Sequence, residues 1–540
     1  MAGRVAGGRH SRLPAANTAL PTRAHAELPH PKGDLYSVIE FWNEVAPKDE
    51  ALVEDDRRWT WSDLADRVSR LAAALAEDGM RSGDRFASLD KNSTTTVEAT
   101  LAAARNGYAH VIVNWRLAPD ELAYILADAQ AGVLFVGAEF VPQLEEIRSR
   151  LPELTKVVVV GGDADEYEHY LASAQPVQRT HQPAPDDCVL QLYTSGTTGF
   201  PKGAMLTHRS LEAHCITAVE AFHLTRDSVN MVAMPLCHVG GSSWSLLSIY
   251  TGARTVIVRA VVPADVLEQI GRERVTHAFF VPTIFEYLLA APELDSADLS
   301  SLRCLVYGGA PMPPPLMRRC LDRFRQDFYQ AYGMTEASGA VCVLEPAAHR
   351  DPDRTHLLAS AGRPVKGVQV KVVNPVTEQE VRTGQTGEFW IRSDQVMVGY
   401  WRKPDADGDS FHDGWLHTGD AGYQDEAGYL FVRGRVKEMI ISGGENIYPV
   451  EVERVLAQHP AVAEACVIGV PDPTYGEAVK AVVTTAPDAV LDEGKLIAFC
   501  REHLAAYKCP KSVDVVRELP RTATGKVLKR ELRRPYWTND

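Results

Sequence analysis

Hydroxyl side chains, glycines and one lysine crowd into a single short segment of the sequence. This segment reads Tyr193-Thr194-Ser195-Gly196-Thr197-Thr198-Gly199-Phe200-Pro201-Lys202-Gly203. Glycines let the backbone approach a ligand and direct several N–H groups at one point, while hydroxyls and Lys202 add donors and positive charge. The pattern predicts a loop that binds a polyphosphate. It is not a Walker A loop, because Pro201 precedes the lysine and no Gly-Lys-Ser/Thr is present.

The apolar pattern on both sides of this loop predicts the elements that position it. Residues 189–193 form an apolar, strand-like run. Residues 207–222 have apolar side chains at helical spacing, with Leu211, Cys215 and Val219 on one face. The loop is therefore expected between a strand and a helix.

Seven further segments combine residues that could do chemistry, although each has an ordinary explanation when taken alone. They are 234–241, 308–311, 329–336, 415–420, 433–440, 442–449 and 520–526. A lone histidine such as His238 is more often a satisfied core residue, and Asp420 suits a turn. Glu336 and Lys526 would be solvated surface charges. Cys237 could be a nucleophile, but a buried free cysteine is more often a small hydrophobe.

Taken together and in order, these segments resemble the motifs of the adenylate-forming superfamily, which includes acyl-CoA synthetases, nonribosomal-peptide adenylation domains and beetle luciferase. The resemblance extends from about Trp61 to Lys529. It implies ATP, Mg²⁺ and coenzyme A as cofactor and co-substrates, with Lys526 joining the carboxylate to the α-phosphate. Glu336 would bind Mg²⁺ and Thr335 a phosphate, since one carboxylate plus phosphate oxygens is a usual Mg²⁺ site.

The same resemblance assigns the remaining site residues. Nucleotide contacts are implied for Thr194, Ser195, Gly196, Thr197, Thr198, Gly199, Lys202, Gly309, Ala310, Pro311, Tyr332, Asp420 and Arg435. Among these, Tyr332 stacks on adenine, and Asp420 holds the ribose diol because a carboxylate accepts from both hydroxyls. Coenzyme A is expected at Gly443, Gly444 and Glu445. The acyl group is expected at His238, its gate, and at Val239, Gly241, Tyr307, Gly308 and Ala337.

The resemblance further implies that one site runs two half-reactions in turn. Lys437 is the implied hinge, because a few residues that absorb a large φ/ψ change suffice for domain rotation. Rotation withdraws Lys526 and brings Gly443 and Gly444 forward to guide coenzyme A. Arg433 departs from the acid or lysine often found at this family position, which bears on local contacts only.

Helical and β-branched segments alternate along the chain, which predicts an α/β fold. Residues 60–78 suit a helix capped by Thr60 and stopped by Gly79. We expect a large multi-subdomain N-terminal domain of layered β-sheets and helices, and a small mobile α+β C-terminal domain. The expected boundaries are a disordered tail at 1–33, the N-terminal domain at 34–433, the hinge at 434–437 and the C-terminal domain at 438–540.

The composition excludes some classes of function. Among 540 residues, 56 Lys and Arg face 71 Asp and Glu, so the net charge of −15 disfavours nucleic acids as partners. Nine cysteines without a CxxC pair indicate reduced thiols and a cytoplasmic location. No apolar run reaches the ~18 residues of a transmembrane helix. Small-molecule substrates are expected; a homodimer stays open.

The identity of the acid is the least determined feature of the sequence. The small, apolar acyl residues favour a medium- or long-chain fatty acid, with an aryl or sterol side-chain acid as alternatives. A ligase that loads a carrier protein is a rival with the same fold. A catalytically dead acyl or nucleotide sensor is a rival of another class, but such a protein should have lost Lys526, Glu336 or the hydroxyls of 194–198.

Overall fold

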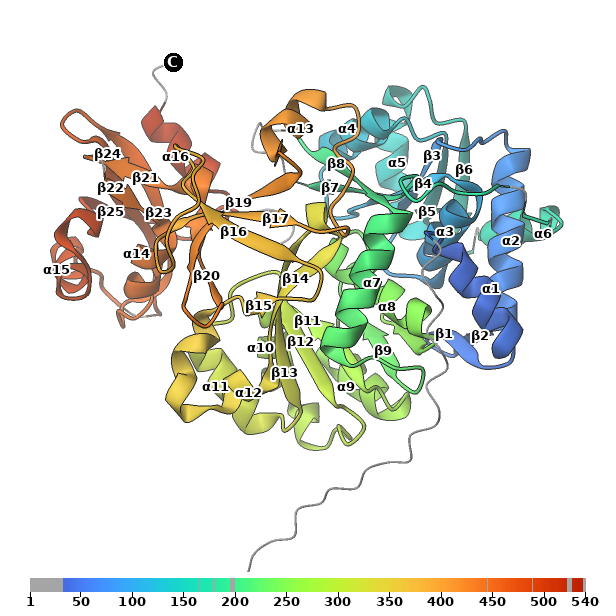
Figure 1. Cartoon of the computed structure of the whole chain (residues 1–540), viewed down its shortest axis with the longest axis horizontal. Coiled ribbons are helices and arrows are strands. Elements are labelled where there is room, and N and C mark those ends of the chain that lie inside the picture. The colour runs from blue at the N-terminus through green and yellow to red at the C-terminus, as the bar shows by residue number, and fades with distance from the viewer. Residues whose placement is uncertain are drawn as a thin grey trace, which may run out of the picture.

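The computed structural model describes residues 33–163, 165–176, 178–179, 181–194, 200–443, 445–487, 489–521 and 527–537. Within these ranges the strands form four sheets, three in a large N-terminal domain and one in a small C-terminal domain (Figure 1). The predicted α/β class is therefore confirmed. The expected tail lies outside the described residues except for Gly33, whose N–H donates to Glu212 Oε2 at 3.1 Å.

The first sheet has six strands in the order β6-β5-β3-β4-β7-β8, and only β8 is antiparallel to its neighbour. Its strands are β3 (Arg85–Leu89), β4 (Ala109–Val113), β5 (Val133–Gly137), β6 (Lys156–Val160), β7 (Cys188–Thr194) and β8 (Lys202–Thr207). Its helices are α2 (Trp61–Glu77), α3 (Thr94–Asn106), α4 (Pro119–Ala129), η1 (Ala138–Phe140), α5 (Val141–Ile147), η2 (Arg148–Arg150) and α6 (Tyr167–Ser173).

Helix α2 confirms the prediction for residues 60–78. Thr60 Oγ1 accepts a hydrogen bond from the Asp63 N–H at 3.1 Å, while Asp63 Oδ2 accepts one from the Thr60 N–H at 2.9 Å. These two bonds satisfy N–H groups that a helix start leaves without intrahelical partners. Gly79 follows with a φ of +91°, the left-handed conformation that glycine adopts without strain.

The second sheet has nine strands in the order β15-β14-β13-β12-β11-β9-β10-β1-β2, parallel from β13 to β1. Its strands are β1 (Glu50–Glu54), β2 (Arg57–Thr60), β9 (Val229–Val232), β10 (Arg254–Ile257), β11 (His277–Phe280), β12 (Cys304–Gly308), β13 (Asp327–Met334), β14 (Gly339–Leu344) and β15 (Arg363–Pro364). Its helices are α1 (Tyr36–Val45), α7 (His208–Phe222), α8 (Val239–Thr251), α9 (Pro263–Arg272), α10 (Pro282–Ala290), η3 (Pro292–Asp295), α11 (Pro314–Arg323), η4 (Thr335–Ala337), α12 (Pro346–Arg350) and η5 (Pro352–Ala359).

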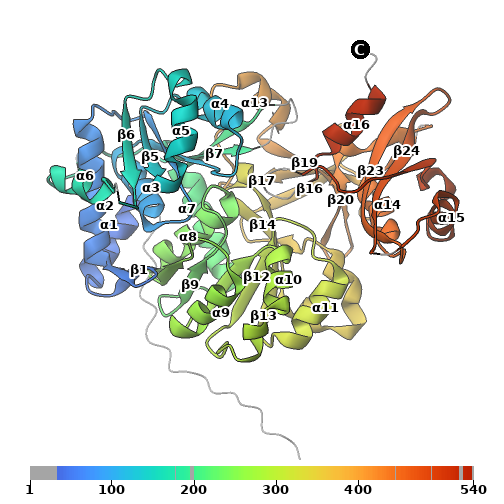
Figure 2. The same cartoon turned by 180° about the vertical axis from the view of Figure 1, so that it is seen from behind.

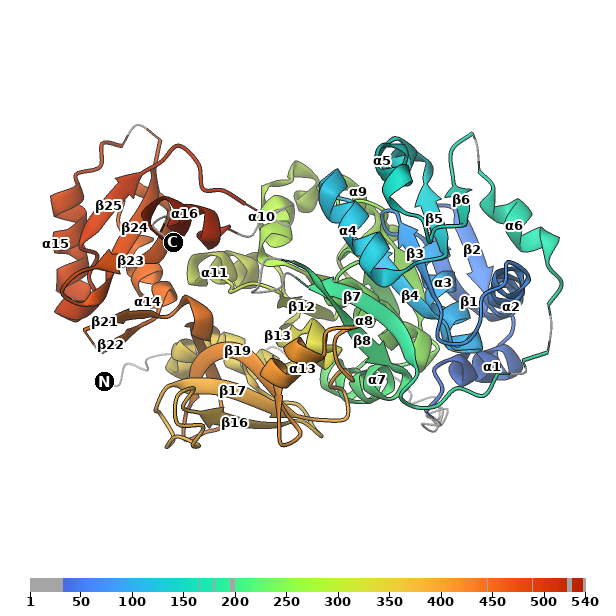
Figure 3. The ribbon, with the colours of Figure 1, turned by 90° about the horizontal axis from the view of Figure 1, so that it is seen from above.

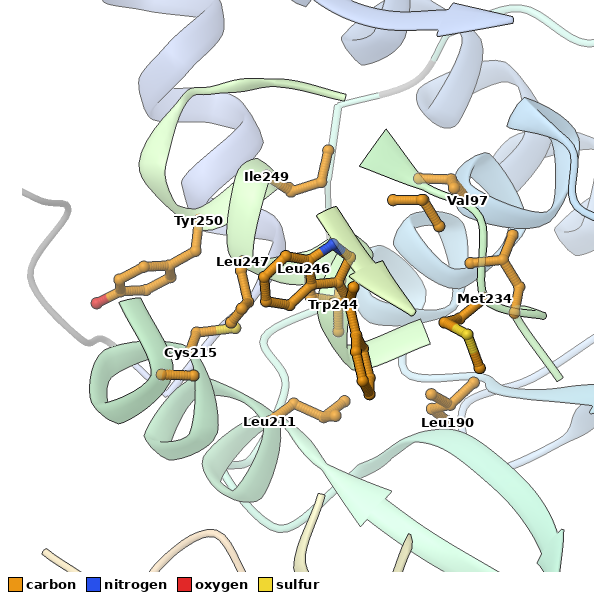
Figure 4. Packing of buried hydrophobic residues seen from close by; sticks show 14 of the residues in the cluster. Val97, Leu190, Leu211, Cys215, Met234, Trp244, Leu246, Leu247, Ile249 and Tyr250 are labelled. Carbon is orange, nitrogen blue, oxygen red and sulfur yellow. The ribbon is translucent and has the colours of Figure 1, made fainter. Parts of the chain in front are cut away.

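One hydrophobic core joins these two sheets. It includes residues of both sheets and of helices α1, α2, α7 and α8. Figure 4 shows part of it, where Trp244 and Leu247 of α8 gather with Leu211 of α7 and Leu190 of β7. Helix α8 therefore shares its core with α7 and with β7, the strand before the predicted phosphate loop.

The third sheet is antiparallel and leads to the C-terminal domain. It contains β16 (Gln369–Val373), β17 (Gly387–Arg392), β18 (Phe411–His412), β19 (Trp415–Gln424) and β20 (Leu430–Arg435), and α13 (Pro404–Ser410) lies beside it. Figures 1 and 2 both place β20 between the C-terminal domain and the rest of the molecule.

The fourth sheet, with its own hydrophobic cores, makes up the C-terminal domain. Its elements are η6 (Val436–Glu438), β21 (Ile440–Ser442), β22 (Glu445–Ile447), α14 (Pro449–Leu456), β23 (Val462–Asp472), β24 (Gly476–Thr485), α15 (Glu493–His503), η7 (Ala506–Lys508), β25 (Ser512–Val515) and α16 (Lys529–Trp537). The predicted helix starts at Pro449 and Asp492 are confirmed. Seen from above, α15 and α6 lie at opposite ends of the molecule (Figure 3).

Glu451 of α14 forms one ion pair with β20 and another within the C-terminal domain. Arg433 of β20 binds Glu451 Oε1 at 2.8 Å, and Lys508 of η7 binds Glu451 Oε2 at 2.6 Å. The ion pair between Arg433 and Glu451 therefore spans the expected hinge at residues 434–437. That domain boundary stays a prediction. None of the helices in the described ranges is both long and apolar enough to cross a membrane.

Candidate active site

A β-hairpin carries the phosphate loop predicted from the sequence. Strands β7 and β8 are antiparallel with Thr194 opposite Lys202, so the two ends of the loop are fixed side by side. The loop residues Ser195, Gly196, Thr197, Thr198 and Gly199 lie outside the described residues. The expected direct passage from loop to helix is wrong, because residues 202–207 form β8. Helix α7 begins at His208, where the Thr207 side chain accepts from the Ser210 N–H at 3.2 Å.

Glu336 lies on η4, directly after β13, and is only 8% exposed. Its Oε1 accepts a hydrogen bond from Thr194 Oγ1 at 3.2 Å and another from the Tyr400 hydroxyl at 2.8 Å. The structure thus brings together Thr194 and Glu336, which are 142 residues apart. Within the described ranges no residue donates a hydrogen bond to Glu336 Oε2. That oxygen is therefore the one left for a ligand.

Tyr400 belongs to the segment 395–401, which we call the strap. The strap runs beside β8, where the Trp401 N–H donates to the Gly203 carbonyl at 2.8 Å, and beside η4, where the Met397 N–H donates to the Glu336 carbonyl at 2.9 Å. The Lys202 ammonium lies 5.1 Å from the centre of the Tyr400 ring. Sequence reasoning missed Tyr400; the available signal was a glycine followed by two aromatic residues.

A second buried carboxylate is Asp420, for which the sequence predicts a contact with the nucleoside. Its Oδ2 accepts from the Tyr332 hydroxyl at 2.7 Å, and its Oδ1 lies 3.0 Å from Arg435 Nε. Strand pairing explains this meeting, because Asp420 of β19 lies opposite Arg435 of β20. Burial, and then the negative charge of Asp420, raises the pKa of Tyr332 well above its ordinary value. Three residues predicted to contact nucleoside are therefore together.

The predicted adenine turn follows the end of β12. Gly309 has a φ of +74°, and Gly309, Ala310 and Pro311 are exposed. A Cβ on Gly308 would lie 2.4 Å from the Ala331 carbonyl oxygen of β13, so only glycine permits this approach of the two strands. The turn thus presents open backbone beside the strand that carries Tyr332.

His238 precedes the first turn of α8, and its carbonyl accepts from the N–H groups of Gly241 and Ser242 at 2.9 and 3.0 Å. Burial, with a smaller contribution from Arg116, lowers the pKa of His238 to about 4, so the ring is neutral near pH 7. Burial raises the pKa of the neighbouring Cys237 thiol to about 12. Cys237 therefore lacks the thiolate of a nucleophile, which supports the hydrophobe interpretation.

The expected acyl residues fall on two sides of the second sheet. Val239 and Gly241 lie on the first turn of α8, and Gly308 faces the same side, because Phe279 lies 3.0 Å from a Cβ on Gly240 and 3.4 Å from one on Gly308. Ala337 is fully buried within η4.

Tyr307 does not belong with this group. It is fully buried, and its hydroxyl hydrogen-bonds to His349 Nε2 of α12 at 2.9 Å. Neighbouring residues of a strand point to opposite faces, so Tyr307 and Gly308 cannot line the same space. Phe279, which sequence reasoning missed, occupies the position beside Gly308; the signal was its alternation with Phe280 in β11.

The predicted residues of the C-terminal domain are only partly described. Lys437 is exposed on η6, and Gly443 has a φ of +60° with its N–H bonded to the Tyr475 carbonyl at 2.8 Å. Gly444, the Glu445 side chain and Lys526 lie outside the described residues. Arg521 and Val527 pair across the segment that contains Lys526, which fixes its two ends together.

The residues around Glu336 fit a magnesium ion that is shared with a nucleotide. One carboxylate oxygen is fixed by two neutral hydroxyls, and the other takes no hydrogen bond from the described residues. Mg²⁺ commonly uses one or two protein carboxylates together with phosphate oxygens and water. No group of three or more His, Cys, Asp and Glu that could hold a metal by itself occurs in the described ranges. The fit is thus to a cation that arrives with phosphates.

Comparison with known proteins agrees with this geometry. The model of the AMP-binding enzyme family matches residues 39–401, and that of the AMP-binding enzyme C-terminal domain matches residues 451–526. A feruloyl-CoA synthase of Amycolatopsis sp. is 41% identical over 481 residues, which cover 88% of this chain and 94% of that protein. A fatty acid–[acyl-carrier-protein] ligase of Streptomyces coeruleorubidus is 36% identical over 515 residues, covering 94% and 98%.

A solved structure extends the similarity to three dimensions. The anthranilate CoA ligase in complex with anthranoyl-AMP has a TM-score of 0.82 and 30% identity, and covers 93% of this chain and 97% of that chain. The chain therefore belongs to the AMP-binding enzyme family, the adenylate-forming superfamily of acyl-CoA synthetases. Within it, the chain is an AMP-forming acid–thiol ligase of the acyl- and aryl-CoA ligase group.

Proposed function

We propose that the chain activates a hydrophobic carboxylic acid with Mg·ATP and transfers the acyl group to coenzyme A, with an aromatic acid as the preferred substrate. The proposal depends above all on the contact between Thr194 and Glu336. It sets a buried carboxylate at one end of the phosphate loop, with Lys202 at the other. A carboxylate for a divalent cation beside donors for phosphate oxygens is suited to nucleotidyl transfer.

In the first half-reaction, a carboxylate oxygen of the acid bonds to the α-phosphorus of ATP. The bond from that phosphorus to the bridging oxygen breaks, and pyrophosphate leaves. Lys202 and Thr335 stabilise the phosphate charge, and Lys526 holds the acid against the α-phosphate. Bound Mg²⁺ supplies further charge neutralisation at the phosphate oxygens. Asp420 and Arg435 orient the nucleoside.

In the second half-reaction, the sulfur of coenzyme A bonds to the acyl carbon, the bond from that carbon to the phosphate oxygen breaks, and AMP leaves, while the thiol proton passes to solvent. We propose that rotation about Lys437 separates the two steps by removing Lys526 and bringing Gly443 and Gly444 forward. Lys526→Ala should lower adenylation at least ~10²-fold while sparing thioester formation from supplied acyl-AMP. Single-turnover assays of each half-reaction would contradict the assignment if both fell equally.

An aromatic acid is preferred over a fatty acid because of Phe279. Its ring lies between the first turn of α8 and the end of β12, and Trp244 packs edge-on against it at 5.7 Å between ring centres. These rings restrict a long chain but suit a planar acid, since aromatic rings favour edge-to-face and offset contacts. The relatives named for feruloyl and anthranoyl groups support this choice.

A fatty acid is the second candidate, supported by the relative named for fatty acids. Acid-dependent pyrophosphate exchange with benzoic- and cinnamic-type acids, and with C6–C16 fatty acids, tests both. We expect kcat/KM to be at least tenfold higher for aromatic acids, and Phe279→Val to shift the preference toward longer chains. An optimum of the wild-type enzyme at C12–C16 fatty acids would establish the second candidate. If none of the tested acids supported pyrophosphate exchange, the proposed adenylation itself would be overturned.

The acceptor and the compartment are also part of the proposal. Coenzyme A is preferred, and the relative that serves an acyl carrier protein defines the alternative acceptor; parallel assays with coenzyme A and a phosphopantetheinylated carrier distinguish them. All nine cysteines are free, which supports a reducing cytoplasm. That the chain forms a homodimer stays a prediction, which sedimentation measurements of its mass in solution can test.

A further inference from the structure

Tyr400 connects two predicted site residues that otherwise lie on separate elements. Its hydroxyl donates to Glu336 Oε1 at 2.8 Å, and its ring lies 5.1 Å from the Lys202 ammonium. Because a carboxylate only accepts hydrogen bonds, the Tyr400 hydroxyl is the donor of this bond.

The strap holds Tyr400 from both sides. The Tyr400 N–H donates to Asp407 Oδ1 at 2.7 Å, and the indole N–H of Trp401 donates to the Asp128 carbonyl at 3.0 Å. Gln395 is fully buried and donates to the carbonyl of Ala337 at 3.1 Å, directly after Glu336. Because backbone and side-chain bonds fix the strap against η4, the hydroxyl is directed at one carboxylate oxygen.

The kind of donor matters as much as its position. A lysine or arginine in place of the tyrosine would neutralise Glu336 and weaken its attraction for a cation. Two neutral hydroxyls, from Thr194 and Tyr400, fix Oε1 but leave the negative charge in place. Partners of this kind orient metal-binding carboxylates and tune their affinity.

We propose that Tyr400 is a positioning residue for Glu336: it fixes Oε1 so that Oε2 faces a divalent cation, and its ring keeps the Lys202 ammonium beside the same point. This inference rests on the proposed function, because the cation is the one that accompanies ATP. Neither role was expected from the sequence.

Tyr400→Phe removes the hydroxyl and retains the ring, so it tests the hydrogen bond alone. Calorimetric titration of ATP at increasing Mg²⁺ gives a readout that does not depend on turnover. We expect the variant to need about 10–100-fold more Mg²⁺ for half-maximal binding, the usual cost of losing such a partner. ATP binding without a divalent cation should stay within about twofold of wild type.

Tyr170→Phe is the matched control, since Tyr170 is also 8% exposed and also donates to a carboxylate, Asp78 Oδ2 at 2.8 Å. It should bind Mg·ATP like wild type, with a similar change in thermal midpoint to Tyr400→Phe. If the control loses the Mg²⁺ response equally, the effect is a general loss of stability and the inference is wrong.

A double-mutant cycle with Glu336→Gln gives the second test. If Tyr400 acts through Glu336, then Tyr400→Phe should change Mg²⁺-dependent binding less than twofold in the Glu336→Gln background. A full additional loss in that background would overturn the inference. So would a wild-type Mg²⁺ response of Tyr400→Phe alone, whereas a wild-type protein without any Mg²⁺-dependent ATP binding would instead refute the proposed function.

Discussion

Glu336 and Asp420 are buried to almost the same extent, at 8% and 7% exposure, but their partners differ in charge. Glu336 is held by two neutral hydroxyls through one oxygen, and its other oxygen takes no hydrogen bond within the described ranges. Asp420 has a tyrosine hydroxyl on one oxygen and the Arg435 guanidinium beside the other. Neutral donors preserve the charge that a cation needs, whereas an arginine offsets it and leaves a hydrogen-bond acceptor for neutral hydroxyls.

The most severe way to break this contrast is Glu336→Gln. The amide can keep a hydrogen bond to Thr194 but loses the charge, so adenylation should fall about 10²–10³-fold. The measurement is acid-dependent pyrophosphate exchange across a range of Mg²⁺ concentrations. A variant that retains the wild-type rate and the wild-type Mg²⁺ optimum would show that Glu336 is not the metal-binding carboxylate.

Two glycine-to-alanine substitutions compare how tightly the backbone is packed near Glu336 and near Asp420. Gly339, the first residue of β14, has a φ of +140°, and a Cβ there would lie 2.5 Å from His214 Cε1. Gly419, before Asp420, has a φ of +68° but its nearest neighbour to a Cβ is Arg435 Nη1 at 3.6 Å. We expect Gly339→Ala to cost about 3 kcal/mol of unfolding free energy and Gly419→Ala about 1 kcal/mol. Urea titration measures both, and equal losses would contradict the close packing at Gly339.

Asp420→Asn should have a smaller effect on catalysis than Glu336→Gln. The amide oxygen can still accept from Tyr332, and the proposed contact to ribose is remote from the reacting phosphorus. We therefore expect KM for ATP to rise about tenfold with kcat nearly unchanged, the signature of lost uniform binding. Steady-state kinetics decide this, and a collapse of kcat would place Asp420 in the chemical step.

The smallest expected effect is a pH dependence of stability that comes from His214, on the Glu336 side of this comparison. Burial lowers the pKa of His214, which packs against Gly339, to about 4 from an ordinary 6.5. In this pH range His214 binds a proton in the unfolded chain but stays neutral in the folded chain. The free energy of unfolding therefore falls as the pH falls from about 6.5 toward 4. At pH 5.5 this amounts to about 1 kcal/mol. Thermal midpoints between pH 7 and 5 should be less pH-dependent in His214→Gln, and an unchanged slope would exclude this contribution.

Local patterns were sufficient for much of the fold, whereas most of the nucleotide residues were assigned by the family resemblance and stay predictions. The capping pair Thr60 and Asp63 marks the start of α2, because its two bonds are formed within four residues. The dense hydroxyl and glycine segment that begins near Thr194 predicts a phosphate loop by itself, but Glu336 receives its role only from the resemblance. The meeting of Thr194 and Glu336 across 142 residues depends on strand order, which no local pattern contains.

The failures have equally specific causes. The sequence predicts that the phosphate loop leads directly into a helix, but residues 202–207 form β8 and Thr207 caps α7. The resemblance predicts Tyr307 beside Gly308 at the acyl group, whereas the two-residue period of β12 points Tyr307 toward His349. Tyr400 and Phe279 gain their positions only from tertiary contacts with Lys202, Glu336 and two glycines.

The ion pair between Arg433 and Glu451 joins the last strand before the proposed hinge to the first helix after it. If the C-terminal domain turns about Lys437, these two charges must separate in every turnover. Dissolved ions screen such a pair, so moderate salt should speed the switch between half-reactions even while it weakens the hold on ATP. The ionic strength at which the ligase is most active would then reflect a balance between ATP affinity, which salt lowers, and the rate of domain rotation, which salt raises.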